Sequence, residues 1–128
     1  MRLKIRILNE SDVTEKYVNW FSNKDVTKFS NNQYLEFSIS SQLNFINTCL
    51  KNNDKDLYGI FDSKSHIGNI CIEGLESYHN NAKITYLVGE RTYWGNGVGF
   101  FAVSKIINLA KKKYKLNKLY ADCADSNY

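Results

Sequence analysis

The stretch Ile84–Tyr114, ITYLVGERTYWGNGVGFFAVSKIINLAKKKY, contains the transition that decides the fold. An apolar run ends near Val88, three of the seven glycines follow within residues 95–99, and a segment with helical spacing begins directly after them. The first N–H groups of a helix bind anions, and glycine lets the backbone approach one closely. We therefore predict strand, glycine loop and helix, with donors from Trp94–Gly99 around an anion such as a pyrophosphate. The alternative is that the glycines only turn the chain.

Two common nucleotide-binding motifs do not fit this loop. A Walker loop needs Gly-Lys-Ser or Gly-Lys-Thr where the helix starts, and this chain has Val98-Gly99-Phe100 there. A dinucleotide fingerprint belongs in the first strand-helix unit, with an acidic residue about twenty positions on. Here several apolar runs precede the loop, and Asp122 fits that acidic position only loosely. An NTPase and a Rossmann enzyme are both poor explanations.

The whole chain has 128 residues, 43% of them hydrophobic, which predicts one domain spanning residues 1–128. It has no apolar run long enough to cross a membrane, and the amino terminus alternates instead of forming a signal peptide, so we expect a cytoplasmic protein. The three cysteines are widely spaced and predict buried thiols, with no metal site. The lysines at 111–115 account for much of the net charge of +4 and suit a helix end, so nucleic acid is not needed to explain them.

The rest of the sequence predicts an ordered series of short elements. An alternating strand at 2–8 precedes a helix at 11–21 capped by Asp12, and a loop leads to a second helix whose apolar stripe is Leu43, Ile46 and Leu50. Two strands at 57–62 and 66–75 are expected to pair as a hairpin. A strand at 83–89, the glycine loop, a helix at 98–114 and a strand at 116–124 complete the order. Only this last unit has the form of a parallel crossover.

These features together resemble the GNAT acyltransferase family. Its pattern, Arg or Gln, two residues, Gly, one residue, then Gly or Ala, falls on Trp94, Gly97 and Gly99, with Gly95 extra. Trp94 departs from the pattern as it does in the YWGxGxG branch, and the opening stretch RILNESDVTEKYVNWFSNKDVTKF is also similar to that branch. The resemblance implies an α+β, three-layer fold with a mixed, mainly antiparallel central sheet flanked by helices. The two strands and helix that usually end the family's fold do not follow here, so we expect either that the chain is a C-terminally truncated fragment or that something else supplies the missing part.

The resemblance implies acetyl-CoA as cosubstrate and a set of residues that bind it. The pantetheine arm is expected between the fourth and fifth strands, along the backbone of Tyr86, Leu87 and Val88. The pyrophosphate is expected at Trp94, Gly95, Asn96, Gly97, Val98 and Gly99, and Asn127 matches an asparagine that commonly reaches the cofactor.

Acetyl transfer to an amine needs a base, an oxyanion donor and an acid for the thiolate. The carboxylates nearest the expected cleft are Glu73, Glu76 and Glu90, and we take Glu73 or Glu76 as the candidate base, with a relayed water as the rival. His66 and His79 are interpreted as ordinary loop residues. The family's usual acid is a tyrosine beyond the fifth strand, which Tyr128 does not match. The acceptor pocket is expected from aromatic side chains of the first helices and their loop, although Trp20 is expected mostly in the core: Trp20, Phe29, Tyr34 and Phe37.

We therefore expect an acetyl-CoA-dependent N-acetyltransferase that acts on a small-molecule or peptide amine, either an amino sugar or a protein amino terminus. The rival is a non-catalytic GNAT-like module that binds coenzyme A or a protein partner. No nucleic acid, membrane or metal is expected as a partner, and a homodimer is left open.

Overall fold

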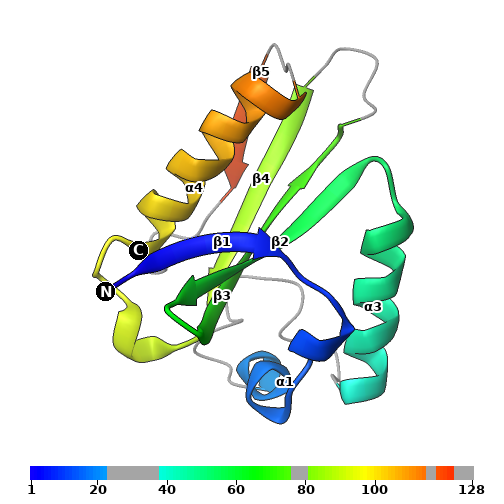
Figure 1. The fold of residues 1–128 in the computed structure, drawn as a ribbon, viewed down its shortest axis with the longest axis vertical. Coiled ribbons are helices and arrows are strands. Elements are labelled where there is room, and N and C mark those ends of the chain that lie inside the picture. Colours follow the sequence, from blue (N-terminus) through cyan, green and yellow to red (C-terminus); the bar gives the residue numbers. More distant parts are fainter. Residues whose placement is uncertain (23–37, 76–80, 115–117, 123–128) are drawn as a thin grey trace.

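The computed structural model describes residues 1–22, 38–75, 81–114 and 118–122. Five strands form one sheet in the order of the sequence: β1 (Leu3–Ile7), β2 (Lys55–Asp62), β3 (Ser65–Glu73), β4 (Asn81–Val88) and β5 (Lys118–Asp122). The first four strands pair antiparallel, and β5 lies parallel to β4 (Figure 1). The mixed, mainly antiparallel sheet and the parallel crossover at its end are confirmed.

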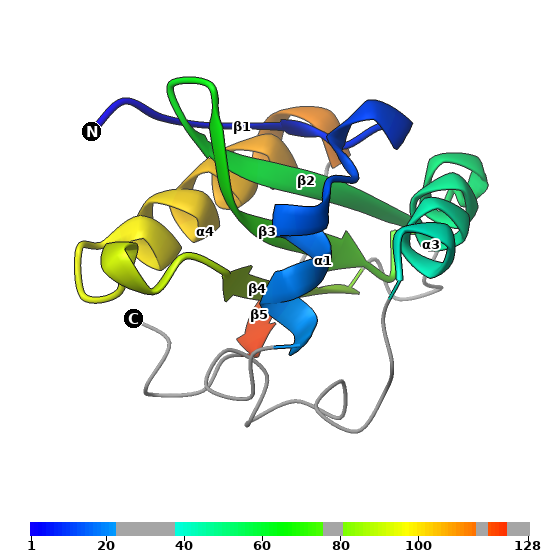
Figure 2. The same cartoon turned by 90° about the horizontal axis from the view of Figure 1, so that it is seen from below.

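The helices lie on both faces of this sheet. Helix α4 (Val98–Leu109), which continues into the π-helical turn η4 (Ala110–Tyr114), packs on one face and connects β4 to β5. Helices α1 (Glu15–Ser22) and α3 (Ile39–Lys51) pack on the other face, so α4 and α1 lie on opposite sides in Figure 2. Each face has its own apolar core, which explains why β2, β3 and β4 are apolar on both sides.

The first helix starts later than the sequence predicts. Thr14 caps α1, since its hydroxyl accepts a hydrogen bond from the Tyr17 N–H at 3.2 Å. Asp12 lies instead in a short 3-10 helix, η1 (Glu10–Asp12), where it shares a capping box with Asn9 and pairs with Arg6 at 2.7 Å. The predicted Asp12 cap of α1 is therefore wrong, because a local turn and an ion pair already use this carboxylate.

Helix α3 begins one residue after Ser38, whose side chain forms a capping box with Ser41. Its buried face is Gln42, Ile46 and Cys49, whereas Leu50 is half exposed. The predicted stripe was thus correct at Ile46 only, because the sequence pattern did not include the buried polar residue Gln42. The expected burial of Cys49 is confirmed.

The β2–β3 hairpin contains a β-bulge that sets the direction of side chains. Ile60 lies opposite Gly68 and Phe61 lies opposite His66, so Ile67 is the extra residue. The bulge brings His66 to the same face of the sheet as Asn69, three positions away, where the two side chains are hydrogen-bonded.

Candidate functional site

The glycine loop is a short, exposed turn that ends at the start of α4. A 3-10 turn, η3 (Arg91–Tyr93), leads through Trp94 to Gly95 and Gly97, both with φ of +78°. Gly97 is the N-cap of α4 and provides no side-chain cap for the helix. The first N–H groups of a helix have no carbonyl partner within it, and here they begin directly after three exposed residues, 95–97. The loop therefore presents backbone donors and a positive helix end to solvent.

The three glycines are needed for two different reasons. Gly95 and Gly97 have left-handed backbone conformations, which other residues adopt at a cost. A Cβ built on Gly97 meets nothing within 4 Å, so the space beside it is open. A Cβ on Gly99 would lie 2.6 Å from the ring of Tyr86, so Gly99 is small because α4 packs closely on β4. Gly99 thus allows α4 to pack closely on β4. The sequence alone did not distinguish this role from anion binding.

The last residues of β4 lie beyond the described part of β5, which ends at Asp122. Among the described residues, the β4–β5 pairs run from Asn81 to Thr85, and β4 ends three residues later. The Gly89 N–H donates to Ile67 O at 2.8 Å, so these two residues form a hydrogen-bonded pair of the antiparallel ladder. Backbone groups of successive residues in β4 point alternately toward β3 and away from it. The N–H and C=O of Val88 therefore point to the side of β4 on which β5 lies.

A side chain of the loop is bound to this edge. The Trp94 indole Nε1–H donates to Val88 O at 2.8 Å, and the ring packs against the apolar cores of both sheet faces. The sequence predicted a contribution from the backbone of Trp94 only. A tryptophan at the position of the usual Arg or Gln was the available signal, but a sequence does not reveal which acceptor an indole reaches.

The sheet face opposite α4 carries a row of charged side chains where β3 ends and β4 begins. Lys55, Glu73 and Lys83 lie side by side on neighbouring strands, since Glu73 is opposite both lysines. The Glu73–Lys83 and Gly68–Val88 pairs are five residue pairs apart, or roughly 17 Å along the strands. Glu73 is therefore distant from Val88. Glu76 and Asn127 lie outside the described residues.

The third candidate carboxylate, Glu90, is held in place by α1. Its Oε1 accepts a hydrogen bond from Trp20 Nε1 at 2.9 Å and lies 3.3 Å from Lys16 Nζ. The Trp20 ring packs against Gly89, where a Cβ would be 2.1 Å away. Trp20 is 4% exposed, which confirms that it belongs mostly to the core. Phe29, Tyr34 and Phe37, the other aromatic candidates, lie outside the described residues.

A buried polar chain lies beside Leu87 on the same face. His66 Nε2–H donates to Asn69 Oδ1 at 2.8 Å, and Asn69 Nδ2–H donates to Tyr17 Oη at 3.1 Å. Burial lowers the pKa of His66, and burial raises the pKa of Tyr17 to about 12. His66 is thus a stacked, half-buried residue of β3, between the rings of Tyr17 and Phe61, and its interpretation as a loop residue is wrong. His79 lies outside the described residues.

With this geometry in place, the comparisons identify the family. A family model described as the acetyltransferase (GNAT) domain matches residues 2–128. The chain belongs to the GNAT acetyltransferases. Enzymes of this family take the acetyl group from acetyl-CoA, so the predicted cosubstrate is confirmed. A search of the curated proteins gave no significant match.

Solved structures with the same GNAT fold include a spermidine N-acetyltransferase from Vibrio cholerae in complex with CoA and spermine. It has a TM-score of 0.78 and 18% identity, covering 94% of this chain and 70% of that chain. A structure described as a probable acetyltransferase has a TM-score of 0.81 and 18% identity, covering 99% and 73% of the two chains. A chimera of the Vibrio cholerae enzyme and hSSAT has a TM-score of 0.77 and 17% identity, covering 99% and 73%. At these identities the likeness shows the fold alone.

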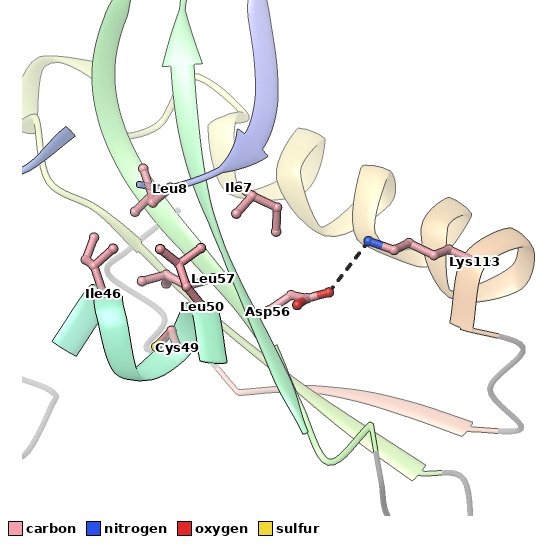
Figure 3. Close-up of a pocket in the computed structure, with 8 residues that line it drawn as sticks. All are labelled: Ile7, Leu8, Ile46, Cys49, Leu50, Asp56, Leu57 and Lys113. Carbon is pink, nitrogen blue, oxygen red and sulfur yellow. Dashed lines mark ion pairs between the residues drawn. The ribbon is translucent and has the colours of Figure 1, made fainter. Parts of the chain in front are cut away.

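A pocket of about 180 Å³ lies elsewhere on this GNAT domain, where α3 meets β1 and β2 (Figure 3). Its lining is mostly apolar, with the Asp56–Lys113 ion pair of 3.7 Å at one side: Ile7, Leu8, Ile46, Cys49, Leu50, Asp56, Leu57 and Lys113. No predicted site residue lines it. Among the described residues, no group of three metal-ligating side chains comes together, and no helix has the length and apolarity needed to cross a membrane.

Proposed function

We propose that residues 1–128 form one acyltransferase domain that transfers an acetyl group from acetyl-CoA to a primary amine on a negatively charged acceptor. The single observation that supports the cofactor site is the exposed glycine loop at the start of α4. We assign the pyrophosphate to the loop of Trp94, Gly95, Asn96, Gly97, Val98 and Gly99, and the pantetheine arm to Leu87 and Val88. The N–H groups of Trp94 and Asn96 already donate to Arg91 O and Tyr93 O, so the other residues of the loop supply the backbone donors. Asn127 is included as a further cofactor residue.

The choice of an anionic acceptor follows from the charged row opposite α4. On this face of β2, β3 and β4, the charged side chains among the described residues are Lys55, Glu73 and Lys83, two cations and one anion. A net positive surface favours an acceptor that carries phosphate or carboxylate. An amino sugar linked to a nucleotide carries phosphate and fits this surface. A protein amino terminus carries carboxylate only when acidic residues are next to it, and a polyamine carries no negative group.

The acceptor ammonium must lose a proton before it can attack the thioester. Glu73 lies too far from Val88 to take this proton directly, so we propose that it acts through water. Glu76 stays a second candidate for the base. The pH profile of kcat/KM tests both: Glu73→Gln or Glu76→Gln should remove its acidic limb if that residue is the base.

Coenzyme A release with a panel of amines tests the proposed acceptor. We expect turnover with a nucleotide-linked amino sugar, less with a peptide amine, and least with spermidine. Lys83→Gln should raise the KM of the anionic acceptor at least threefold, since partly exposed ion pairs contribute up to about 1 kcal/mol. Lys64→Gln, which removes the same charge in the β2–β3 turn, is the matched control. Spermidine as the best acceptor contradicts the choice of an anionic substrate.

The non-catalytic alternative predicts binding of coenzyme A without turnover of any amine, and the same panel tests it. The assembly stays open between a monomer, a homodimer and a larger oligomer, and light scattering at micromolar concentration measures it. One similar structure, a spermidine N-acetyltransferase from Vibrio cholerae, is dodecameric.

A further inference from the structure

The two halves of the proposed cofactor site are joined by one side chain. Trp94 stands immediately before Gly95, where the glycine loop begins, and its indole donates to the carbonyl of Val88 at 2.8 Å. The loop at one end of this bond is assigned to the pyrophosphate, and the strand at the other end is assigned to the pantetheine arm. The bond thus crosses between the two parts of a single ligand.

The carbonyl that Trp94 occupies points away from β3, since Val88 directs both of its backbone groups to the other side of β4. Among the described residues, the pairing of β4 with β5 runs only to Thr85. A chain that lies along a free strand edge normally exchanges N–H and C=O bonds with it. The Val88 carbonyl already accepts a hydrogen bond from the Trp94 indole, so only the Val88 N–H can bond to a ligand there.

The indole has little freedom to leave this position. Its ring packs against the apolar cores of both faces, and the Trp94 backbone N–H donates to Arg91 O at 3.0 Å. The guanidinium of Arg91 lies 5.6 Å from the ring centroid. Because the side chain and the backbone are both held, the spacing between loop and strand is set before any ligand binds.

We propose that Trp94 is a positioning residue for acetyl-CoA, which fixes the pantetheine strand relative to the pyrophosphate loop and blocks the Val88 carbonyl. This inference rests on the proposed function. A carbonyl of the ligand then faces the Val88 N–H, while the ligand's own N–H finds its acceptor elsewhere. Without the indole N–H, the ligand gains a competing acceptor at Val88 and can bind in a shifted register.

The test compares two ligands on the full chain by calorimetry: coenzyme A, and 3′-phospho-ADP, which is its nucleotide half without pantetheine. Trp94→Phe keeps a ring but removes the N–H. We expect it to weaken coenzyme A about tenfold and to leave the affinity for 3′-phospho-ADP within twofold. With a turned-over amine, kcat should fall as well, because a shifted thioester is poorly placed.

Trp20→Phe is the matched control, since it also removes an indole N–H, the one bound to Glu90 at 2.9 Å. It should leave both affinities within twofold. If Trp94→Phe fails to fold, benzothienylalanine at position 94 in the Trp20→Phe background replaces the N–H by sulfur with almost no change of shape. The same selective loss of coenzyme A affinity is expected.

The possible failures are distinguishable. If the unaltered protein binds neither ligand, the proposed function fails, and the positioning role fails with it. If the unaltered protein binds both ligands, and Trp94→Phe weakens both affinities equally or changes neither, the positioning role of Trp94 is overturned and the proposed function stands. Only a loss confined to the ligand that contains pantetheine supports it.

Discussion

Gly99 lies directly under the ring of Tyr86, so close that a Cβ at position 99 would be 2.6 Å from the ring. The contact joins the first turn of α4 to the last part of β4, the two elements that flank the proposed cofactor site. Gly99→Ala should destabilise the protein by about 1–3 kcal/mol, the usual cost of overpacking. Urea unfolding measures this change.

The same contact gives the Gly99 prediction its control. Tyr86→Val removes the ring, and in that background Gly99→Ala should cost much less, which a double-mutant cycle detects as a coupling energy. Equal costs in both backgrounds would mean that the ring does not set the size of residue 99.

The bond between Asn69 and Tyr17 should be important for stability, because both side chains are buried. Tyr17→Phe removes the hydroxyl and leaves the Asn69 amide without this acceptor, which should cost about 1–3 kcal/mol. Unfolding in urea measures the loss. A loss well below about 1 kcal/mol contradicts the prediction.

The sequence predicted the elements of the fold well where a regular pattern coincided with a boundary residue. The hairpin, the glycine loop and the crossover helix were all of this kind, since turn residues or glycines end each apolar run. Asp12 was misassigned because two adjacent turns compete for one carboxylate, and only the ion pair with Arg6 decides between them.

The glycine loop was predicted from the sequence, whereas its side-chain contacts were not. Positive φ at Gly95 and Gly97 follows from glycine chemistry, so the loop was accessible from sequence. The bond from Trp94 to Val88 and the contact of Gly99 with Tyr86 depend on distances between segments. His66 was interpreted as a loop residue because it borders the β2–β3 turn, whereas it is the second residue of β3.

Stability should fall on acidification through the neutral range because of His66. Burial lowers the pKa of this imidazole below 6.5, so the unfolded chain takes up a proton at a pH where the folded protein does not. Protons therefore favour unfolding: the full contribution to stability is present above pH 6.5 and is lost as the pH falls. Urea midpoints from pH 7.5 to pH 5.5 should decrease.

His66→Phe keeps a ring in the stack between Tyr17 and Phe61 and should flatten this pH dependence. The comparison is between the slopes of the two proteins, because both contain His79. An unchanged slope in the variant would show that His66 is protonated equally in the folded and unfolded states.

Substitutions at Gly97 can test whether a glycine is required there for its backbone conformation or for the open space beside it. Its φ of +78° disfavours most residues, and a Cβ there meets no atom within 4 Å. Asparagine tolerates the left-handed conformation better than other residues. Gly97→Asn should therefore keep nearly the parent stability, whereas Gly97→Val should lose about 1–3 kcal/mol through strain.

Both substitutions at Gly97 place a side chain beside the first N–H groups of α4, where the pyrophosphate is proposed to bind. Both should therefore weaken the binding of coenzyme A at least tenfold, about 1.4 kcal/mol. Calorimetry on folded protein gives the affinities, and urea unfolding gives the stabilities. If Gly97→Asn binds coenzyme A as tightly as the parent does, the glycine is needed only to turn the chain, and the pyrophosphate does not lie against this residue.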